Sequence, residues 1–541
     1  MTKVEKFLSD KGYDLSELKK DTHTYTVTNL DKAADKLLDA VKNHKHIHVV
    51  ADYDCDGIMS GSILYLILTE LGADFTLRFP GRISDGYGIS QKMVDEIPDK
   101  ESLIITVDNG IAAIEAIEYA RSLGIDVMVL DHHQQRGDGL LPDASCIVDP
   151  HIFKEEGEFE DYCGAGLSYM LAKKLNLSKQ TIIEANVLAA IATIQDVVSL
   201  TGNNRNIVKC GLWILNRKLA SLPGLYSLCS ALKLIPNTDK FAGICEEDIA
   251  FQIGPCINAM GRMLDDGAKL AFEYIMHYDI HGEDGTRAII ECNTERKEET
   301  TRQQNILEIE AEKIKNPKMT CMVLYAPELH EGLIGINAAR IVEKYNMPAI
   351  VLTDDASGLL KGSARSVDGI DIKDCLDKIS EHIFAYGGHA GAAGLSVEKT
   401  ELDAFIKAIN KVTPKAKLNV NTWKYDIEVE ENEISQILDD IKTYGPFGEG
   451  FPAPVIKINN YNLTKNFGKY YRYIGDNGVS FNGNNSEAVT FSLKEKYQAY
   501  GTPLQLNIVG TVGFSRYSKK PQIMGVDFQP MIKKQEAGFL L

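Results

Sequence analysis

The chain has 541 residues, more than one hydrophobic core usually serves, and this length predicts roughly three or four domains. Its hydrophobic content of 44% is ordinary for a globular protein, and no apolar run approaches the ~20 residues that span a bilayer, which excludes a membrane protein. The net charge of −18 argues at first against a nucleic-acid partner, because Lys and Arg drive the binding of phosphates. Residues 456–541 nevertheless carry eleven Lys and Arg against five Asp and Glu, a local charge of +6, so the remainder carries −24.

The N-terminal residues and the cysteines indicate the compartment. Residues 1–6 alternate acids and bases and lack the apolar stretch of a secretory signal. The ten cysteines lie between Cys55 and Cys375 without a C-x-x-C pair, which fits neither a disulfide framework nor a zinc ribbon. We therefore expect reduced thiols and a cytoplasmic protein.

Residues 1–45 are predicted to be helical and carry no evident chemistry. The run from His46 to Ala51 then predicts a strand that leads directly into Asp52, Asp54 and Asp56. Three carboxylates in one loop repel one another by a few kcal/mol unless cations neutralise them, and divalent ions with oxygen ligands are the usual remedy. The alternative is an acidic turn in which one aspartate caps the following helix.

Three further segments are built in the same way. The predicted strand at 103–107 ends in Asp108, the strand at 126–130 ends in Asp131, His132 and His133, and the apolar run at 187–194 ends before Asp196. Helices predicted at 57–71 and 112–123 alternate with the strands, so the sheet should be parallel and doubly wound. Because ligands bind at the carboxyl ends of such strands, we expect these polar groups to meet at one edge.

Several glycine-rich segments could contact an anion. The first carries Arg82, which is either a solvated loop charge or a phosphate contact. Residues 254–262 are bracketed by glycine and either turn the chain or present Asn258 and Arg262 to an anion. Residues 163–167 are small enough to permit close backbone approach.

A long exposed helix is predicted over residues 286–316, as a spacer before a second α/β unit that begins at Met319. Two glycine-rich segments of this unit, 361–366 and 386–394, are predicted to be loops whose N–H groups cradle phosphate, although tight turns are the commoner use of such loops. The side chains that could assist them are Ser363, Arg365 and His389.

From about residue 418 short β-type runs predict a small barrel or sandwich. Residues 467–473 interleave aromatic and basic side chains, as expected where nucleobases stack and phosphates are neutralised. The alternative is an ordinary strand with Tyr and Lys on its solvent face.

Together these motifs resemble the DHH phosphoesterase superfamily and, within it, the RecJ family of exonucleases that degrade single-stranded DNA from 5′ to 3′. The residues that carry the resemblance are Asp52–Gly57, Val107–Gly110, Asp131–His133, Ala192–Val198, Asn258–Arg262, His330–Gly335, Gly362–Ser366 and Gly387–Gly391. The chain departs from the family pattern at Cys55, Cys256 and Leu329.

The resemblance implies an α/β protein in which a parallel-sheet DHH domain (1–285) is joined by a long helix (286–318) to a smaller α/β DHHA1 domain (319–417). A small β-barrel of the OB type (418–541) follows.

The resemblance also implies roles for single residues. Two Mn²⁺ or Mg²⁺ ions would be held by Asp54, Asp56, Asp108, His132 and Asp196, with Asp108 bridging and Asp52 a weaker candidate. The catalytic residues would be His133, Asp56 and Asp108. The 5′ phosphate would be gripped by Arg82, Ser363 and Arg365, and the backbone by Asn258, Arg262, Gly388 and His389.

The function so implied is two-metal-ion hydrolysis of single-stranded DNA from its 5′ end, in repair and recombination, by a monomer that needs no membrane. A DHH phosphodiesterase for small molecules or short oligonucleotides is one alternative, and a non-catalytic replication factor is the other. The segment after residue 418 favours a polymeric substrate, and the complete acidic cluster favours catalysis. Whether a helicase or a single-strand-binding protein is a partner stays open.

Overall fold

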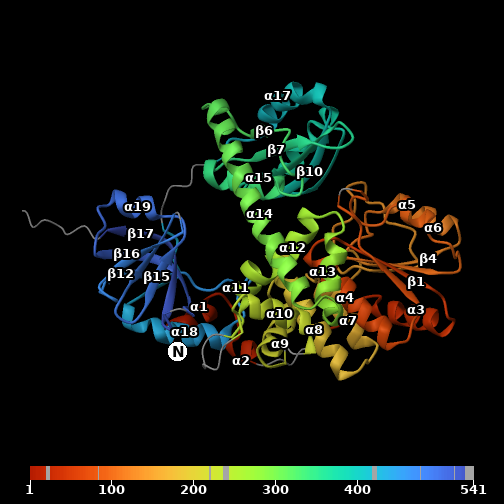
Figure 1. Cartoon of the computed structure of the whole chain (residues 1–541), viewed down its shortest axis with the longest axis horizontal. Coiled ribbons are helices and arrows are strands. Elements are labelled where there is room, and N and C mark those ends of the chain that lie inside the picture. The colour runs from red at the N-terminus through yellow and green to blue at the C-terminus, as the bar shows by residue number, and fades with distance from the viewer. Residues whose placement is uncertain are drawn as a thin grey trace, which may run out of the picture. The chain divides into compact units, whose positions relative to one another are not determined.

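The computed structural model describes residues 1–19, 25–82, 84–218, 221–235, 243–416, 423–475, 477–516 and 518–530. Two compact units are present (Figure 1). The first consists of Met1–Ile257, Ala268–Thr286 and Thr422–Leu541, and the second of Asn258–Gly267 and Arg287–Asn421. The expected boundary between residues 417 and 418 lies outside the described residues.

Five parallel strands form one sheet of the first unit in the order β2-β1-β3-β4-β5. They are β1 (Ile47–Ala51), β2 (Phe75–Arg78), β3 (Leu103–Val107), β4 (Asp126–Leu130) and β5 (Cys146–Val148). Since β1 pairs with both β2 and β3, the strand order reverses between β1 and β3. Ligands of open parallel sheets bind at the carboxyl ends beside such a reversal. The predicted α/β fold with a parallel sheet is confirmed.

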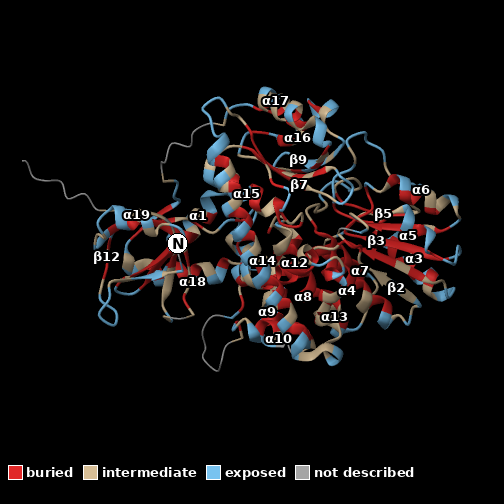
Figure 2. Cartoon of the chain, turned by 45° about the horizontal axis from the view of Figure 1, so that its top comes forward, coloured by how far each residue is buried: buried red, intermediate tan, exposed pale blue. Residues whose placement is uncertain are grey.

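Helices accompany this sheet and continue into a helical region. They are α3 (Leu30–Lys42), α4 (Cys55–Glu70), α5 (Gln91–Asp95), α6 (Ile114–Ser122), α7 (Gly164–Lys174), α8 (Lys179–Gln195), α9 (Gly202–Lys218), α10 (Pro223–Ala231), α11 (Glu246–Asp248), the π-helix η2 (Ile249–Ile253), α12 (Gly254–Met263) and α13 (Gly267–Met276). Helix α8 packs against α4, α7 and α9, and its residues 185–193 are all buried (Figure 2). A helix that is apolar on every side is suited to such a central position. None of the described helices combines the length and apolar character needed to cross a membrane.

The second unit contains a mixed sheet in the order β6-β7-β8-β10-β9. Its strands are β6 (Met322–Tyr325), β7 (Ala349–Asp354), β8 (Leu360–Arg365), β9 (Ala385–His389) and β10 (Ala392–Val397), and only β6 and β7 pair in parallel. Alternate residues of β7 enter two separate cores, so both faces of the sheet are covered. One core contains α14 (Tyr278–Ile314) and α15 (Ile334–Tyr345), and the other contains α16 (Ile372–Asp377) and α17 (Leu402–Val412).

Glycine-rich segments of the second unit were expected to be loops, and the structure corrects this. Residues 361–365 belong to β8, and most of 386–394 forms the β9–β10 hairpin. Glycine is needed at 362 because a Cβ there would lie 2.6 Å from the Leu352 side chain. Of the two interpretations of 254–262, the turn is wrong, since these residues form α12. Helix α14 is kinked at Gly282, and the long helix predicted at 286–316 lies in the part that follows the kink and ends at Ile314.

A third sheet, of seven strands, lies in the C-terminal part of the first unit, in the order β11-β12-β16-β17-β15-β14-β13. The strands are β11 (Ile427–Val429), β12 (Ile456–Asn462), β13 (Tyr471–Ile474), β14 (Gly478–Asn482), β15 (Glu487–Thr490), β16 (Gln505–Phe514) and β17 (Pro521–Pro530), with helices α18 (Ile434–Tyr444) and α19 (Lys494–Ala499).

The N-terminal helices pack against this C-terminal part. Helix α1 (Lys3–Asp10) contacts α18 and β11, α2 (Leu15–Lys19) contacts α18, and the Tyr444 hydroxyl donates to Glu5 Oε1 at 2.6 Å. The buried Arg205 guanidinium of α9 donates to the carbonyls of Tyr444, Gly445 and Pro446. These contacts tie the C-terminal sheet to the rest of the first unit.

Candidate active site

The loop after β1 places three carboxylates at the reversal of the first sheet. Asp54 caps α4 by accepting the Gly57 N–H at 3.1 Å. A Cβ at Gly57 would lie 2.3 Å from the Asp52 carbonyl oxygen, so only glycine permits this tight turn. Both Asp52 and Asp56 are buried. The expected cap at Asp54 and the expected cation site therefore share one loop.

Backbone N–H groups at the start of α7 fix the Asp56 carboxylate. Gly164 N and Ala165 N, at the start of α7, donate to its two carboxylate oxygens at 2.6 and 2.8 Å. A Cβ on Gly164 would lie only 2.7 Å from the Asp108 Cβ. The predicted close backbone approach at 163–167 is confirmed, and it brings α7 directly against the acidic cluster.

Asp108 follows β3 with a φ of 60°, in the left-handed region that non-glycine residues seldom adopt. Its neighbour Asn109 is fully buried and donates to the carbonyls of Val50 at 3.0 Å and Val107 at 2.9 Å, which joins the ends of β1 and β3. The Asp108 carboxylate oxygen Oδ1 lies 3.1 Å from His132 Nε2. The hydrogen bonds that join the ends of β1 and β3 stabilise this strained backbone conformation.

The segment after β4 orients two imidazoles through Asp131. This buried carboxylate accepts the N–H groups of Ile111, His132 and His133, and its Oδ1 lies 2.8 Å from His133 Nδ1. The other ring nitrogen of His133, Nε2, lies 3.2 Å from the Tyr87 hydroxyl. Sequence reasoning missed Tyr87, because its only signal is one aromatic side chain in a glycine-rich loop.

Asp196 reaches the site from the C-terminal end of α8. His132 Nε2 lies 3.6 Å from Asp56 Oδ2 and 3.7 Å from Asp196 Oδ2. Three overlapping groups have ligand atoms that all lie within 4.8 Å of one another. They are Asp52, Asp54 and Asp108; Asp56, His132 and Asp196; and Asp108, His132 and His133. The structure thus brings together all the residues that the sequence proposed as metal ligands.

Burial and mutual repulsion dominate the electrostatics of the cluster. Burial, and then the charges of neighbouring aspartates, raise the pKa of Asp108 and Asp196 well above the ordinary value. Burial lowers the pKa of His132 to about 4, which leaves a neutral ring with a free lone pair on one nitrogen. Burial alone would also lower the pKa of His133, but the hydrogen bond to Asp131 raises it to about 9.

This donor set fits divalent cations. One carboxylate oxygen of Asp52 is buried without a hydrogen-bond partner among the described residues, which is costly unless a ligand satisfies it. Carboxylate oxygens with imidazole, and no thiolate in the three groups, suit Mn²⁺ or Mg²⁺. Cations would also relieve the repulsion that burial intensifies.

The candidate substrate residues divide between the two units. Arg82 belongs to the first, where its guanidinium stacks 4.9 Å from the Tyr53 ring centroid. The other six belong to the second: Asn258, Arg262, Ser363, Arg365, Gly388 and His389. Asn258 and Arg262 lie on α12, and Gly388 and His389 end β9.

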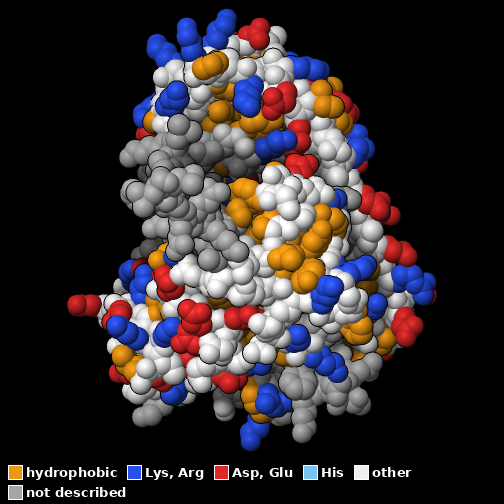
Figure 3. Space-filling view, turned by 90° about the vertical axis from the view of Figure 1, so that its left-hand side faces the viewer, with side chains coloured by type: hydrophobic (Ala, Val, Ile, Leu, Met, Phe, Trp, Pro, Cys, Tyr) orange, Lys and Arg blue, Asp and Glu red, His pale blue; other side chains and the backbone are white. Residues whose placement is uncertain are grey.

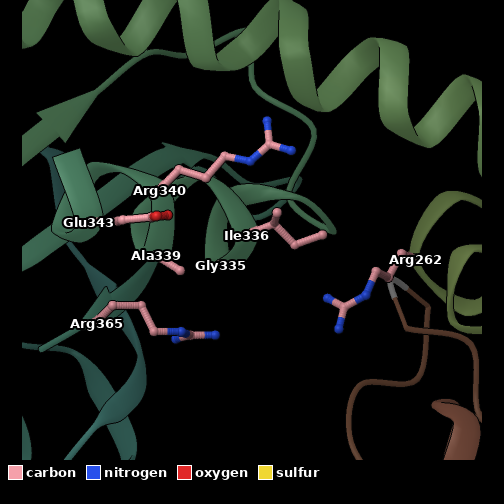
Figure 4. Close-up of a pocket in the computed structure, with 7 residues that line it drawn as sticks. All are labelled: Arg262, Gly335, Ile336, Ala339, Arg340, Glu343 and Arg365. Carbon is pink, nitrogen blue, oxygen red and sulfur yellow. The ribbon is translucent and has the colours of Figure 1, made fainter. Parts of the chain in front are cut away.

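A pocket of about 370 Å³ in the second unit gathers arginines. Its lining residues are Arg262, Gly335, Ile336, Ala339, Arg340, Glu343 and Arg365, and the guanidinium groups of Arg262 and Arg365 face each other across it (Figure 4). Arg365 donates to Ser363 Oγ at 2.9 Å, and no carboxylate among the described residues forms an ion pair with it. A half-buried cation without a carboxylate partner marks a place for an anion. Sequence reasoning missed Arg340, because an arginine in a predicted helix usually lies on the solvent-exposed face of that helix.

Three family models match the chain in order: the DHH family N-terminal domain at residues 46–193, the DHHA1 domain at 318–414 and the RecJ OB domain at 425–526. The single-stranded-DNA-specific exonuclease RecJ of Salmonella typhimurium is 32% identical over 460 residues, which cover 79% of this chain and 77% of that protein. The chain also resembles the crystal structure of Thermus thermophilus RecJ with Mn²⁺, with a TM-score of 0.79 at 24% identity, covering 98% of this chain and 76% of that one. A crystal structure of exonuclease RecJ bound to manganese is 29% identical with a TM-score of 0.60, covering 71% and 94%. The chain therefore belongs to the RecJ family.

Proposed function

We propose that this protein is a metal-dependent exonuclease that degrades single-stranded DNA from its 5′ end, and that it serves DNA repair and recombination. The observation that carries the proposal is the buried cluster of aspartates and histidines at the reversal of the first sheet, in a chain of the RecJ family. Members of this family are named for activity on single-stranded DNA.

We assign two divalent cations, Mn²⁺ or Mg²⁺, to the cluster. Asp54 and Asp108, with Asp52, would hold one ion, and Asp56, His132 and Asp196 the other. Asp108 lies 3.1 Å from His132 and so is suited to bridge. Bound there, such ions neutralise the phosphate and ionise a water molecule. The manganese in the 29%-identical RecJ structure supports this assignment.

The protein's own groups would complete the reaction. Asp131 fixes the His133 ring through Nδ1, and Nε2, which lies 3.2 Å from the Tyr87 hydroxyl, would exchange that contact for a hydrogen bond to a phosphate oxygen. In its protonated form, that ring would stabilise the negative charge that develops as the phosphodiester bond breaks. Asp56 and Asp108 are held by fixed neighbours, so the site needs little reorganisation.

We further propose that the arginine pocket of the second unit binds phosphate, with Arg365 and Ser363 reading the terminal 5′ phosphate together with Arg82. Guanidinium groups meet two phosphate oxygens at once, and a terminal phosphate carries more charge than an internal diester. Arg262, with Asn258, Gly388 and His389, would follow the strand backbone. Arg340 adds a third guanidinium to the same pocket.

The C-terminal sheet supplies a surface for longer strands. Tyr473 is 41% exposed, and Lys494 Nζ lies 5.2 Å from its ring centroid. Figure 3 views the end of the molecule where α19 and β17 lie, and shows hydrophobic side chains gathered there with Lys and Arg beside them. Aromatic rings next to cations are suited to stacked bases and their phosphates.

We propose that the protein acts as a cytoplasmic monomer, and leave the choice of a helicase or single-strand-binding protein as partner to experiment. Family models at residues 46–193, 318–414 and 425–526 support the proposed domains 1–285, 319–417 and 418–541, with 286–318 as the connecting helix.

The test is a time course on single-stranded DNA labelled at either end, with each end blocked in turn, after chelation and readdition of Mn²⁺ or Mg²⁺. Mononucleotides should be released from the 5′ end only, and only with metal. Release from the 3′ end, or equal release after chelation, would contradict the proposal.

A further inference from the structure

Asp196 is the one member of the proposed metal cluster that no strand of the first sheet positions. It caps α8, and its N–H donates to the Ala192 carbonyl at 2.8 Å. The next residue, Val197, has a φ of 57° and is 64% exposed. A β-branched residue is strained in the left-handed region, so the local sequence does not favour this geometry. A contact from elsewhere must hold the end of α8.

Gln195 makes that contact. It is the last residue of α8, and its side-chain Nε2 donates to two successive carbonyl oxygens of the π-helix η2, those of Ile249 at 3.0 Å and Ala250 at 3.2 Å. Gly254 follows this π-helix, and a Cβ there would lie 1.9 Å from Gln195 Cδ. The wide turn of η2 and the missing side chain at 254 together form a seat for one amide group.

The seat is itself anchored at its other end. Asp248, which precedes η2, is buried and accepts the Cys245 N–H at 2.9 Å and the Gln252 amide at 3.0 Å. Arg516, between β16 and β17, donates to the Asp248 carboxylate, with Nη1 at 2.8 Å from Oδ1. A π-helix is rare and is frequently found at functional sites. Here its position is fixed by a buried carboxylate–arginine pair.

We propose that Gln195 is a positioning residue for Asp196: by fixing the end of α8 to the anchored π-helix, its amide holds the Asp196 carboxylate at the metal-binding distance from Asp56 and His132. This inference rests on the proposed function, in which Asp196 binds one of the two cations. Gln195 acts through the backbone that it shares with Asp196.

The experiment measures Mn²⁺ binding without DNA, by the loss of the free Mn²⁺ electron paramagnetic resonance signal during titration of the full chain. Gln195→Met keeps the side-chain length and removes the donor. Gln180→Met is the matched control, because Gln180 is an exposed residue on the same helix whose amide donates to Glu184, one turn further along that helix. Asp196→Ala is the reference for a lost ligand, and Gln195→Glu is a second variant that turns the donor into an acceptor.

We expect Gln195→Met to weaken one Mn²⁺ site by roughly 10- to 100-fold, as removal of a residue that orients a metal ligand typically does, with the number of sites unchanged at saturation. Gln195→Glu should weaken it at least as far, and Gln180→Met should match the wild type. In kinetics, kcat at low Mn²⁺ should fall and recover as Mn²⁺ is raised, while KM for DNA stays constant.

Wild-type Mn²⁺ affinity in Gln195→Met, with or without a lower Tm, would overturn the inference and reduce Gln195 to a packing contact. If Asp196→Ala retained two sites of wild-type affinity, the assignment of Asp196 as a ligand would fail instead. Loss of affinity in Asp196→Ala but not in either Gln195 variant therefore separates failure of this inference from failure of the proposed function.

Discussion

The two units gather charge of opposite sign. In the first, five aspartates and two histidines converge on the edge of a parallel sheet, and in the second, three arginines and one glutamate line a pocket. Like charges so close together cost free energy of folding, which each site recovers only when a ligand of the opposite sign binds. Both sites are therefore suited to ligands rather than to stability.

The two sites differ in how their charged groups are held. Backbone N–H groups fix Asp56 and Asp131 at distances between 2.6 and 3.2 Å. The arginines sit on long side chains, of which Arg365 is steadied by Ser363. We therefore expect almost any substitution of an aspartate in the acidic cluster to abolish activity. Substitution of a single arginine in the pocket should remove only part of the phosphate binding.

The largest effect should come from Asp108→Ala. Because this carboxylate would be shared by two cations, turnover should fall by at least about three orders of magnitude, several kcal/mol of transition-state stabilisation. Stability without metal should change little, since the loss of one member of a repelling cluster offsets the cost of alanine at a positive φ. Single-turnover cleavage and melting curves, each with and without Mn²⁺, test both effects.

The control for this variant is Asp39→Ala, which removes an exposed aspartate of α3 and should leave turnover unchanged. Mn²⁺ should raise the Tm of the wild type and of Asp39→Ala, because a ligand stabilises the state that binds it. Near-normal turnover of Asp108→Ala in Mn²⁺ would refute the metal assignment.

Arg365→Ala should have the next largest effect. We expect it to cost about 1.5–3 kcal/mol, or one to two decades in kcat/KM, on a 5′-phosphorylated strand, and clearly less on a 5′-hydroxyl strand. Arg365→Lys should recover part of the loss, since an ammonium lacks the planar fork. Two enzymes assayed on two substrates give the comparison, with Arg340→Ala showing whether the third guanidinium shares the role.

An equal penalty on both strands would mean that Arg365 grips an internal phosphate or supports the second unit. Polarity would then need another cause, such as a channel that the 3′ end cannot enter.

Tyr473→Ala should have a smaller effect that depends on strand length. Loss of one stacked base costs ~1–3 kcal/mol, so affinity for long strands should fall while cleavage of very short oligonucleotides is spared. Fluorescence anisotropy with strands of increasing length measures this. Tyr226→Ala is the matched control, because Tyr226 is similarly exposed, at 44%, but lies on α10. An equal loss on short and long strands would show that Tyr473 supports the fold.

The smallest effect is the dependence of the free energy of unfolding on acid pH. This dependence must be known before a loss of activity at low pH is assigned to either site. Burial, and then the charge of His46, lowers the pKa of His48 to about 4 from an ordinary value near 6.5. The unfolded chain therefore takes up the proton first, so the free energy of unfolding falls as pH drops from about 6.5 towards 4. Since His48 is only half-buried, we expect about 1–2 kcal/mol.

His48→Gln should accordingly lose less stability than the wild type between pH 7 and pH 4.5 in urea melts. His44→Asn, at an exposed position, serves as control. Identical pH dependence of wild type and His48→Gln would exclude the half-buried imidazole as a source of acid sensitivity.

The sequence was most informative where a strand ends. Asp54, Asp56, Asp108 and His132 follow apolar runs of strand length, and parallel strands necessarily bring their carboxyl ends together. The period of the side chains therefore predicted both the sheet and the residues that meet at its edge. The order of the motifs along the chain likewise indicated the family.

Long-range contacts were beyond such reasoning. A hydrogen bond joins Glu5 and Tyr444, which are 439 positions apart in the sequence, and no local pattern of side chains predicts that pairing. Glycines misled for a related reason: Gly362 stands in a strand because Leu352 and Leu395 pack closely against it, which only the folded sheet reveals. The same limit hid Gln195, whose amide matters only because η2 lies opposite.

The docking of α1 onto α18 also bears on how the protein is made. Some 430 residues separate Lys3 from its partner Glu433, and at ~5–20 residues per second a ribosome needs roughly 20 to 90 seconds to cover them. During that time the apolar side chains of Val4 and Leu8 have no finished surface to pack against. Helix α1 is therefore made long before the surface of α18 against which it packs, and it is among the last helices to reach its place.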